Sequence, residues 1–144
     1  MARTIVKTKR SRVNPVATLA PAAEAFAYGD LDTWPHSWMG SVNDLPPGEA
    51  LLACVRPFIA HLASSSLTPK TIRIHVDNLW SLGGEIIRDL NDDPALRNVP
   101  ADRLLRKVIH TDGGPLLHNA SEEAQRSFDS TCRKLHRFLC RPQS

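Results

Sequence analysis

Long apolar runs are absent from this chain of 144 residues. No segment approaches the roughly 20 apolar residues that a membrane-spanning helix needs. The basic N-terminus is not followed by the apolar stretch and cleavage site of a secretory signal. Cysteine is also sparse: Cys54, Cys132 and Cys140 form an odd set, which favours free thiols in a reducing cytosol over a disulfide framework. We therefore expect a cytoplasmic protein with no membrane partner.

Motifs of catalysis and cofactor binding are missing as well. The pairs Gly83–Gly84 and Gly113–Gly114 lack the third glycine or the Lys-Ser/Thr of a phosphate-binding loop. Neither G-x-S-x-G nor H-E-x-x-H occurs. Paired carboxylates such as Glu122–Glu123 are expected at helix N-termini, where they complement the helix dipole. We expect no catalytic residue, no enzymatic activity and no cofactor.

Three soft ligands, Cys132, His136 and Cys140, share one helix face at spacings of four. The outer pair would lie about 12 Å apart along the helix axis. Zinc bonds of roughly 2.0–2.3 Å cannot join groups so distant, so at most two of the three could bind one ion. We predict no metal site and treat the cysteines as small hydrophobic residues at the edge of the core.

Positive charge is unevenly distributed, although the net charge is only +3. Residues 13–55 contain no Lys or Arg, whereas residues 1–12 contain five of them and no acidic residue. Such segregation predicts three parts. They are a flexible basic arm with an Ala/Pro tether over 1–27, an acidic-aromatic segment over 28–47, and a helical domain over 48–141.

The strongest pattern present is an amphipathic helix from Thr68 to Leu90, with Thr68 as N-cap and Pro69 at the first helical position. Its apolar face consists of Ile72, Val76, Leu79, Gly83, Ile86, Ile87 and Leu90, with Trp80 and Leu82 at the edges. Gly83 lies in the middle of this face, so it would permit close approach of another helix. The alternative is that Gly83–Gly84 breaks the helix in two.

Three further helices are predicted from apolar periodicity. One begins after Pro46 and Pro47 and ends at about Ala63, with a kink at Pro57. Another spans Pro100 to His110. The last begins near Asn119, with Glu122 in a capping box, and ends at Pro142; it would bury Ala124, Phe128, Leu135, Phe138 and Leu139. These helices predict an all-α fold, a compact bundle of four or five helices after a largely irregular N-terminal segment.

The last helix carries a basic face opposite its apolar stripe. Its members are Arg126, Arg133, Lys134, Arg137 and Arg141. They fall within an arc of roughly 100° and extend about 22 Å along the axis. A charged face often serves solubility alone, but a row of this length could also follow several phosphates. Further candidate nucleic-acid contacts are Lys7, Lys9, Arg10 and Arg12 of the arm, and Lys70 and Arg73.

The segment 28–47 is rich in aromatic residues, among them Tyr28, Trp34 and Trp38, with Met39 beside them. One interpretation is an extended segment whose tryptophans pack onto the helical domain. The other is an acidic, aromatic docking segment for a protein partner.

The segments Phe58–Leu62 and Leu67–Ile72, followed by His75 and Leu79, resemble the N-terminal core-binding domain of phage-integrase-type tyrosine recombinases. In that domain, the first helix ends in a leucine, a short Ser/Thr turn follows, and a Thr-Ile pair begins the second helix. The resemblance covers roughly residues 48–139. The resemblance implies a SAM-like bundle of four or five helices that clamps one face of duplex DNA. It also implies that a mobile element encodes the protein.

The chain departs from that family in the catalytic residues. None of its six histidines is followed by Arg at the third position, and Tyr28 is the only tyrosine. The resemblance therefore implies DNA binding without recombinase chemistry. The alternative is a protein-interaction module, such as a phage or mobile-element inhibitor or adaptor, that docks through Tyr28, Trp34, Trp38 and Met39.

Overall fold

The computed structural model describes residues 30–142, which are helical with no β-strand in that range. The elements are η1 (Leu31–Thr33), α2 (Trp34–Trp38), η2 (Val42–Asp44), α3 (Leu45–Ala63), α4 (Pro69–Asp92), η3 (Pro94–Asn98), α5 (Ala101–Val108) and α6 (Glu122–Cys140), where η denotes a 3-10 helix. The predicted all-α class is confirmed. None of the helices in these residues is long and apolar enough to cross a membrane.

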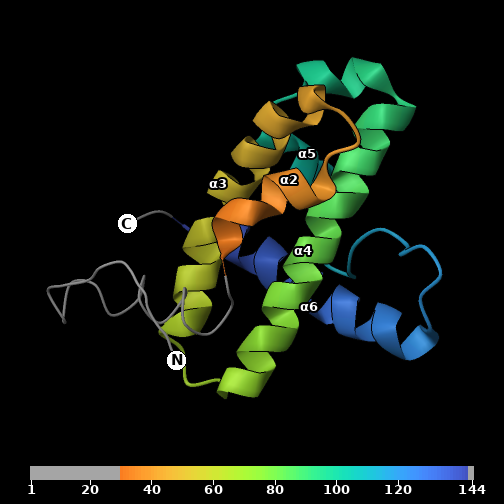
Figure 1. Ribbon diagram of the computed structural model, residues 1–144. Helices are drawn as coiled ribbons and strands as arrows, with labels where there is room; N and C mark the ends of the chain where they lie inside the picture. The colour runs from red at the N-terminus through yellow and green to blue at the C-terminus, as the bar shows by residue number, and fades with distance from the viewer. Residues whose placement is uncertain (1–29, 143–144) are drawn as a thin grey trace, which may run out of the picture.

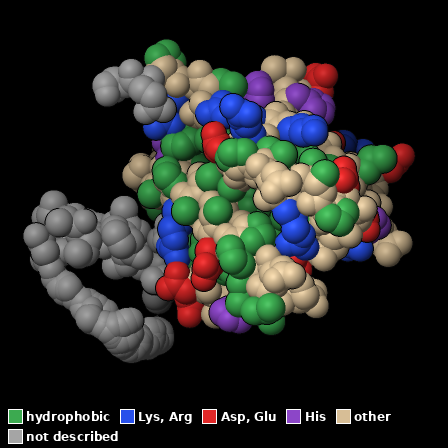
Figure 2. All heavy atoms as spheres, turned by 90° about the horizontal axis from the view of Figure 1, so that it is seen from above, with side chains coloured by type: hydrophobic (Ala, Val, Ile, Leu, Met, Phe, Trp, Pro, Cys, Tyr) green, Lys and Arg blue, Asp and Glu red, His purple; other side chains and the backbone are tan. Residues whose placement is uncertain are grey.

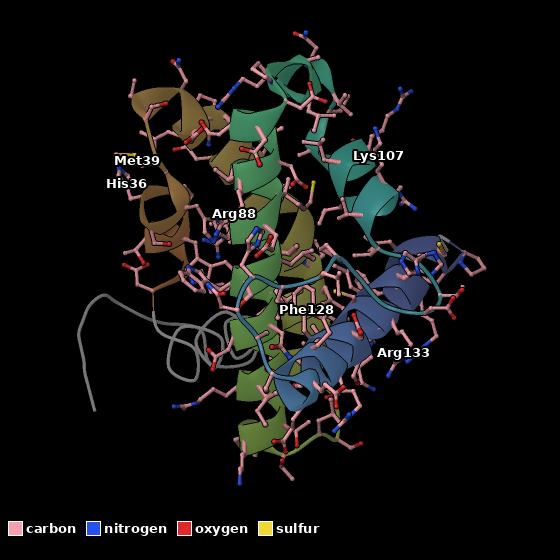
Figure 3. All side chains as sticks on the ribbon, turned by 90° about the vertical axis from the view of Figure 1, so that its right-hand side faces the viewer. His36, Met39, Arg88, Lys107, Phe128 and Arg133 are labelled. Atoms are coloured by element: carbon pink, nitrogen blue, oxygen red, sulfur yellow. The ribbon has the colours of Figure 1, made fainter. Side chains whose placement is uncertain are left out.

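The long helices α3 and α4 lie side by side and run in opposite directions (Figure 1). The short helix α2 lies across one side of this pair and contacts both of its helices. On the other side, α5 packs against α3, and α6 crosses α4 at a steep angle (Figure 3). The core between these layers consists mainly of Leu, Ile and Phe side chains.

α4 follows its predicted pattern closely. The Thr68 hydroxyl accepts a hydrogen bond from the Thr71 amide at 3.2 Å, and Pro69 is the first helical residue. The helix is continuous through Gly83–Gly84, so the two-helix alternative is wrong. All seven predicted residues of the apolar face are buried, together with Leu82 and His75. Trp80, at the edge, is 43% exposed.

α3 begins at Leu45, earlier than predicted, so that Pro46 and Pro47 lie inside its first turn. Proline is tolerated there because the first N–H groups of a helix have no partner within the helix. The helix continues past Pro57 to Ala63. The hydrophobic residues that it buries are Leu51, Leu52, Val55, Phe58, Ile59 and Leu62.

α5 is shorter than predicted, because His110 pairs with Gly113 in an isolated β-bridge instead of extending the helix. α6 begins at Glu122 rather than near Asn119, whose φ of 57° is left-handed. The Ser121 hydroxyl caps the helix, accepting from the Ala124 amide at 3.0 Å. Ala124, predicted to be buried, is exposed on this first turn, since α6 meets α4 from Ser127 onward.

The described part of the aromatic segment folds onto the bundle, but as short helices rather than as an extended segment. Trp34 is only 8% exposed. Trp38 Nε1 donates to the Trp80 carbonyl at 2.9 Å, and Trp80 Nε1 donates to Ser37 Oγ at 2.8 Å. The Trp38 ring lies directly on Gly83, where a Cβ atom would stand 2.2 Å from Trp38 Cζ2. Gly83 thus permits the close approach that the sequence predicted, and α2 is the helix that approaches.

Asp44 is fully buried at the junction of η2, α4 and η3. Its carboxylate accepts hydrogen bonds from the Gly40 amide at 2.7 Å and the Ser41 amide at 3.2 Å. Asn91 Nδ2 donates to it at 3.2 Å, and Arg97 Nη2 forms an ion pair with it at 2.7 Å. No sequence pattern predicted this cluster, which ties the start of α3 to the end of α4.

We expect Asp44 to make stability depend on acid. Burial alone would raise its pKa, but the hydrogen bonds just described, led by that from Arg97, outweigh burial and lower the pKa from 3.8 to about 2. A lowered pKa stabilises the folded state above the ordinary pKa of aspartate, and this contribution is lost as the pH falls towards 2. The contribution to the free energy of unfolding is about 2 kcal/mol.

The measurement is urea unfolding of the wild type and of Asp44→Asn between about pH 6 and about pH 2. The stability advantage of the wild type should shrink as the pH falls. Parallel pH curves for the two proteins would show that Asp44 titrates alike in the folded and unfolded chains.

Candidate nucleic-acid interface

A polar cluster at the contact between α4 and α6 orients α6. Thr131 Oγ1 lies 2.7 Å from His75 Nδ1 and accepts a hydrogen bond of 2.9 Å from Asn78 Nδ2. Asn78 also donates to the Ser127 hydroxyl at 3.1 Å. Burial, and secondarily the positive charge of Lys134, lowers the pKa of His75, which favours a neutral ring. Because buried polar groups require partners, this cluster selects the face of α6 that turns towards α4.

The predicted basic stripe lies on the other face of α6. Figure 3 shows Phe128 where α6 crosses the bundle and Arg133 at the outer edge of the helix. Arg126, Arg137 and Arg141 are exposed, and Arg133 and Lys134 are half-buried. The five cations are therefore accessible from solvent along the length of α6.

Within residues 30–142, none of these five cations forms an ion pair with a carboxylate. Arg133 donates to the Asp112 carbonyl at 3.2 Å, which leaves its positive charge without a counter-charge. By contrast, Arg56, Arg88 and Arg97 all pair with carboxylates elsewhere in the bundle. Lys70, Arg73, Arg103, Arg106 and Lys107 also have no carboxylate partner in this range, so what distinguishes α6 is that its cations form one continuous row.

A groove of about 360 Å³ lies between the C-terminal ends of α3 and α6 and the turn after α3. Its lining residues are Phe58, His61, Leu62, Ser65, Leu67, Lys134, Arg137, Phe138 and Arg141. Three of the five stripe cations thus line it, and no carboxylate does. The volume is within the range of roughly 300–1,000 Å³ typical of ligand pockets.

Aromatic rings form one wall of this groove. The Phe138 ring centroid is 5.3 Å from that of Phe58 and 5.1 Å from that of His61. Phe58 is 1% exposed and forms the floor, whereas the His61 side chain is open to solvent. The Arg141 guanidinium lies 3.6 Å from the Phe138 centroid, a cation–π contact that covers one face of that ring.

The remaining candidate contacts are spread along the chain. Lys70 and Arg73 are exposed on the first turns of α4, just after Leu67 of the groove. The predicted arm contacts lie outside the described residues: Lys7, Lys9, Arg10 and Arg12. The groove thus brings together three stripe cations, while Arg126 and Arg133 extend the charged face towards the start of α6.

The alternative docking residues are placed differently. Trp34 is buried and Trp38 is half-buried under its contacts with α4, whereas Met39 is 41% exposed. Tyr28 lies outside the described residues. Most of the aromatic surface of this segment is therefore used within the molecule.

The three cysteines are free thiols. Cys132 is buried, and burial raises its pKa to about 12, with a smaller contribution from Asp129. Cys140 is exposed, with its Sγ 3.7 Å from His136 Nε2. Cys132 thus lies in the core, whereas Cys140 is open to solvent at the end of α6.

The groove itself was not predicted, because its parts are distant in the sequence. The sequence pattern predicted Phe58 and Phe138 only as core residues of two separate helices. His61 was singled out only as part of the segment that resembles the recombinase family. The one available signal is that a polar or charged residue stands three positions after each phenylalanine, His61 after Phe58 and Arg141 after Phe138. The segments that carry the resemblance, Phe58–Leu62 and Leu67–Ile72, lie at the end of α3 and the start of α4.

Comparisons of the chain with protein-family models, curated proteins and solved structures give no match.

Proposed function

We propose that this protein binds duplex DNA without catalysis, through the basic face of α6. The observation that carries the proposal is the row of five accessible cations with no carboxylate partner among the described residues. Such a row suits phosphate oxygens, which would supply the missing counter-charges. The bundle would then act as a core-binding-like domain on its own.

Clustering of charge, rather than overall charge, supports this function. Residues 30–142 contain 13 Lys and Arg but 14 Asp and Glu, so this part of the chain is not basic as a whole. The face seen from above in Figure 2 shows both signs of charge intermingled among hydrophobic side chains. Only a local surface such as that of α6 would attract a polyanion.

The geometry of α6 fits contacts to the phosphate backbone. The stripe extends about 22 Å, and phosphates recur about every 3.4 Å of helix axis along each DNA strand. A helix lying along or across the backbone could therefore meet several phosphates. Contacts of this kind position a protein on DNA without reading its sequence.

The test is the salt dependence of binding. Each phosphate contact contributes about −0.9 to the slope of log affinity against log salt for duplex DNA. Changing Arg133 and Arg137 together to glutamine should reduce the magnitude of this slope by about 2 and weaken binding to all sequences alike. Fluorescence anisotropy of a labelled duplex at several salt concentrations measures both effects.

Arg88→Gln is the matched control, because Arg88 is exposed on α4 next to Glu85 and outside the stripe. It should leave the slope unchanged. Thermal unfolding of the double variant should stay close to that of the wild type, since within residues 30–142 neither arginine has a carboxylate partner and Arg133 makes a single hydrogen bond, to the Asp112 carbonyl. An equal loss of slope in both variants would argue for diffuse attraction without an interface on α6.

The second candidate function is protein docking near Met39, which is 41% exposed, with Trp80 at 43% exposed on the same side of the bundle. This docking surface has less aromatic area available than the sequence suggested, because Trp34 and Trp38 pack against the bundle. Tight binding to a protein partner without any salt-sensitive DNA binding would favour it.

A further inference from the structure

The groove at the end of α6 has features that a track for duplex phosphates does not need. Its positive rim continues the stripe, but its interior is built from aromatic and aliphatic side chains. In a duplex the bases are stacked and paired inside, so a phosphate backbone would leave this apolar interior unused. An unpaired nucleotide, however, presents a flat base together with its phosphate.

The exposed ring of His61 is the accessible stacking surface. It stands 5.1 Å from Phe138, with an interplanar angle of 45°, and is nearly parallel to the buried Phe58 at 21°. These contacts hold the imidazole in a fixed orientation at the groove wall. The Arg141 guanidinium, on Phe138, offers a second plane of the kind on which bases stack.

Charge and size both favour a nucleotide over an apolar peptide. Lys134, Arg137 and Arg141 line one side of the groove, and no carboxylate is present in its lining. A purely apolar occupant would strip water from these cations without pairing them. A phosphate would pair with them, while its base occupied the apolar part of the groove.

We infer that this groove binds one unpaired nucleotide, with its base against His61 and its phosphate on Lys134, Arg137 and Arg141. The inference rests on the proposed function, because the same groove lies at the end of the stripe that would follow the duplex. The protein would therefore prefer duplex DNA with a single-stranded overhang to a blunt duplex. The α6 stripe would hold the duplex and the groove would hold the end.

The experiment compares three labelled duplexes that share one sequence, using the full chain and fluorescence anisotropy. The first is blunt, the second has a short adenine overhang, and the third has the same overhang made of abasic sugar-phosphate. We expect the adenine overhang to raise affinity about tenfold over the blunt duplex, as base–aromatic stacking of ordinary strength would. The abasic overhang, which adds phosphates but no bases, should give little of this gain.

Two variants and one control locate the effect. In His61→Ala, the ratio of overhang to blunt affinity should fall from about ten to about one. Phe138→Leu should lower the same ratio, because it removes the ring against which His61 and Arg141 both pack and leaves an apolar side chain in its place. The control is His36→Ala, since His36 is exposed on α2, across the bundle from α6 (Figure 3). It should leave the ratio at about ten.

The outcomes separate the two proposals. Salt-sensitive binding that is equal for blunt and overhang duplexes would overturn the groove assignment and leave the α6 stripe standing. A gain that persists with the abasic overhang or in His61→Ala would also overturn it, because stacking would not be the cause. Absence of salt-sensitive binding to any of the three duplexes would overturn both.

Discussion

Replacing Asp44 with alanine should lower the free energy of unfolding by about 3–5 kcal/mol, the range for breaking a buried ion pair. The substitution removes the only carboxylate that pairs with Arg97 among the described residues, and it also removes the acceptor for the Gly40 and Ser41 amides. These hydrogen bonds are partly buried, so each donor that loses its acceptor adds part of the free energy of desolvating it. Chemical denaturation followed by circular dichroism measures the change.

The control for this result is Asp93→Ala. Asp93 is exposed, and its side chain makes no cap hydrogen bond at η3. We expect a change within about 0.5 kcal/mol, as for most surface substitutions. If Asp44→Ala were equally mild, the carboxylate would not be the link between the start of α3 and the end of α4.

Gly83→Ala should destabilise the protein by about 1–3 kcal/mol, although alanine is the better helix former by roughly 1 kcal/mol. The added methyl group would stand 2.2 Å from Trp38 Cζ2, so the indole has to move. Moving it breaks the hydrogen bond from Trp38 Nε1 to the Trp80 carbonyl. Overpacking and the lost hydrogen bond therefore outweigh helix propensity.

Gly84→Ala is a matched control on the next residue of the same helix. Its Cβ atom would lie 3.5 Å from Trp38 Cδ1, an ordinary van der Waals contact. This variant should be neutral or stabilised by up to about 1 kcal/mol. In a Trp38→Ala background, Gly83→Ala should no longer destabilise. If Gly83→Ala raised stability in the wild type, the Trp38 ring would not lie on that face in solution.

The sequence predicted the helices well where one segment carried the whole signal. The periodicity of α4 and its N-cap at Thr68 are local, so both could be read directly. The predicted start of α6 was wrong by a few residues, because Asn119 and Ser121 are both plausible N-cap residues. Only the backbone conformation shows that Asn119 is left-handed. Helix boundaries of this kind depend on tertiary context.

The candidate site was predicted only in part, for a related reason. The stripe on α6 is a property of one helix and could be found from spacing alone. The groove requires the end of α3 to meet the end of α6, which no local pattern encodes. The same holds for His75 and Thr131, which are 56 residues apart yet share a hydrogen bond.

The way α2 sits on α4 also determines what the protein's own fluorescence can report. All three tryptophans of the chain belong to this one contact: the rings of Trp34 and Trp38 are 5.7 Å apart, and Trp38 donates to the Trp80 carbonyl. None of them lines the groove at the end of α6. Intrinsic emission is thus a built-in probe of whether α2 is seated, and it is spatially separate from the surface on which DNA would lie.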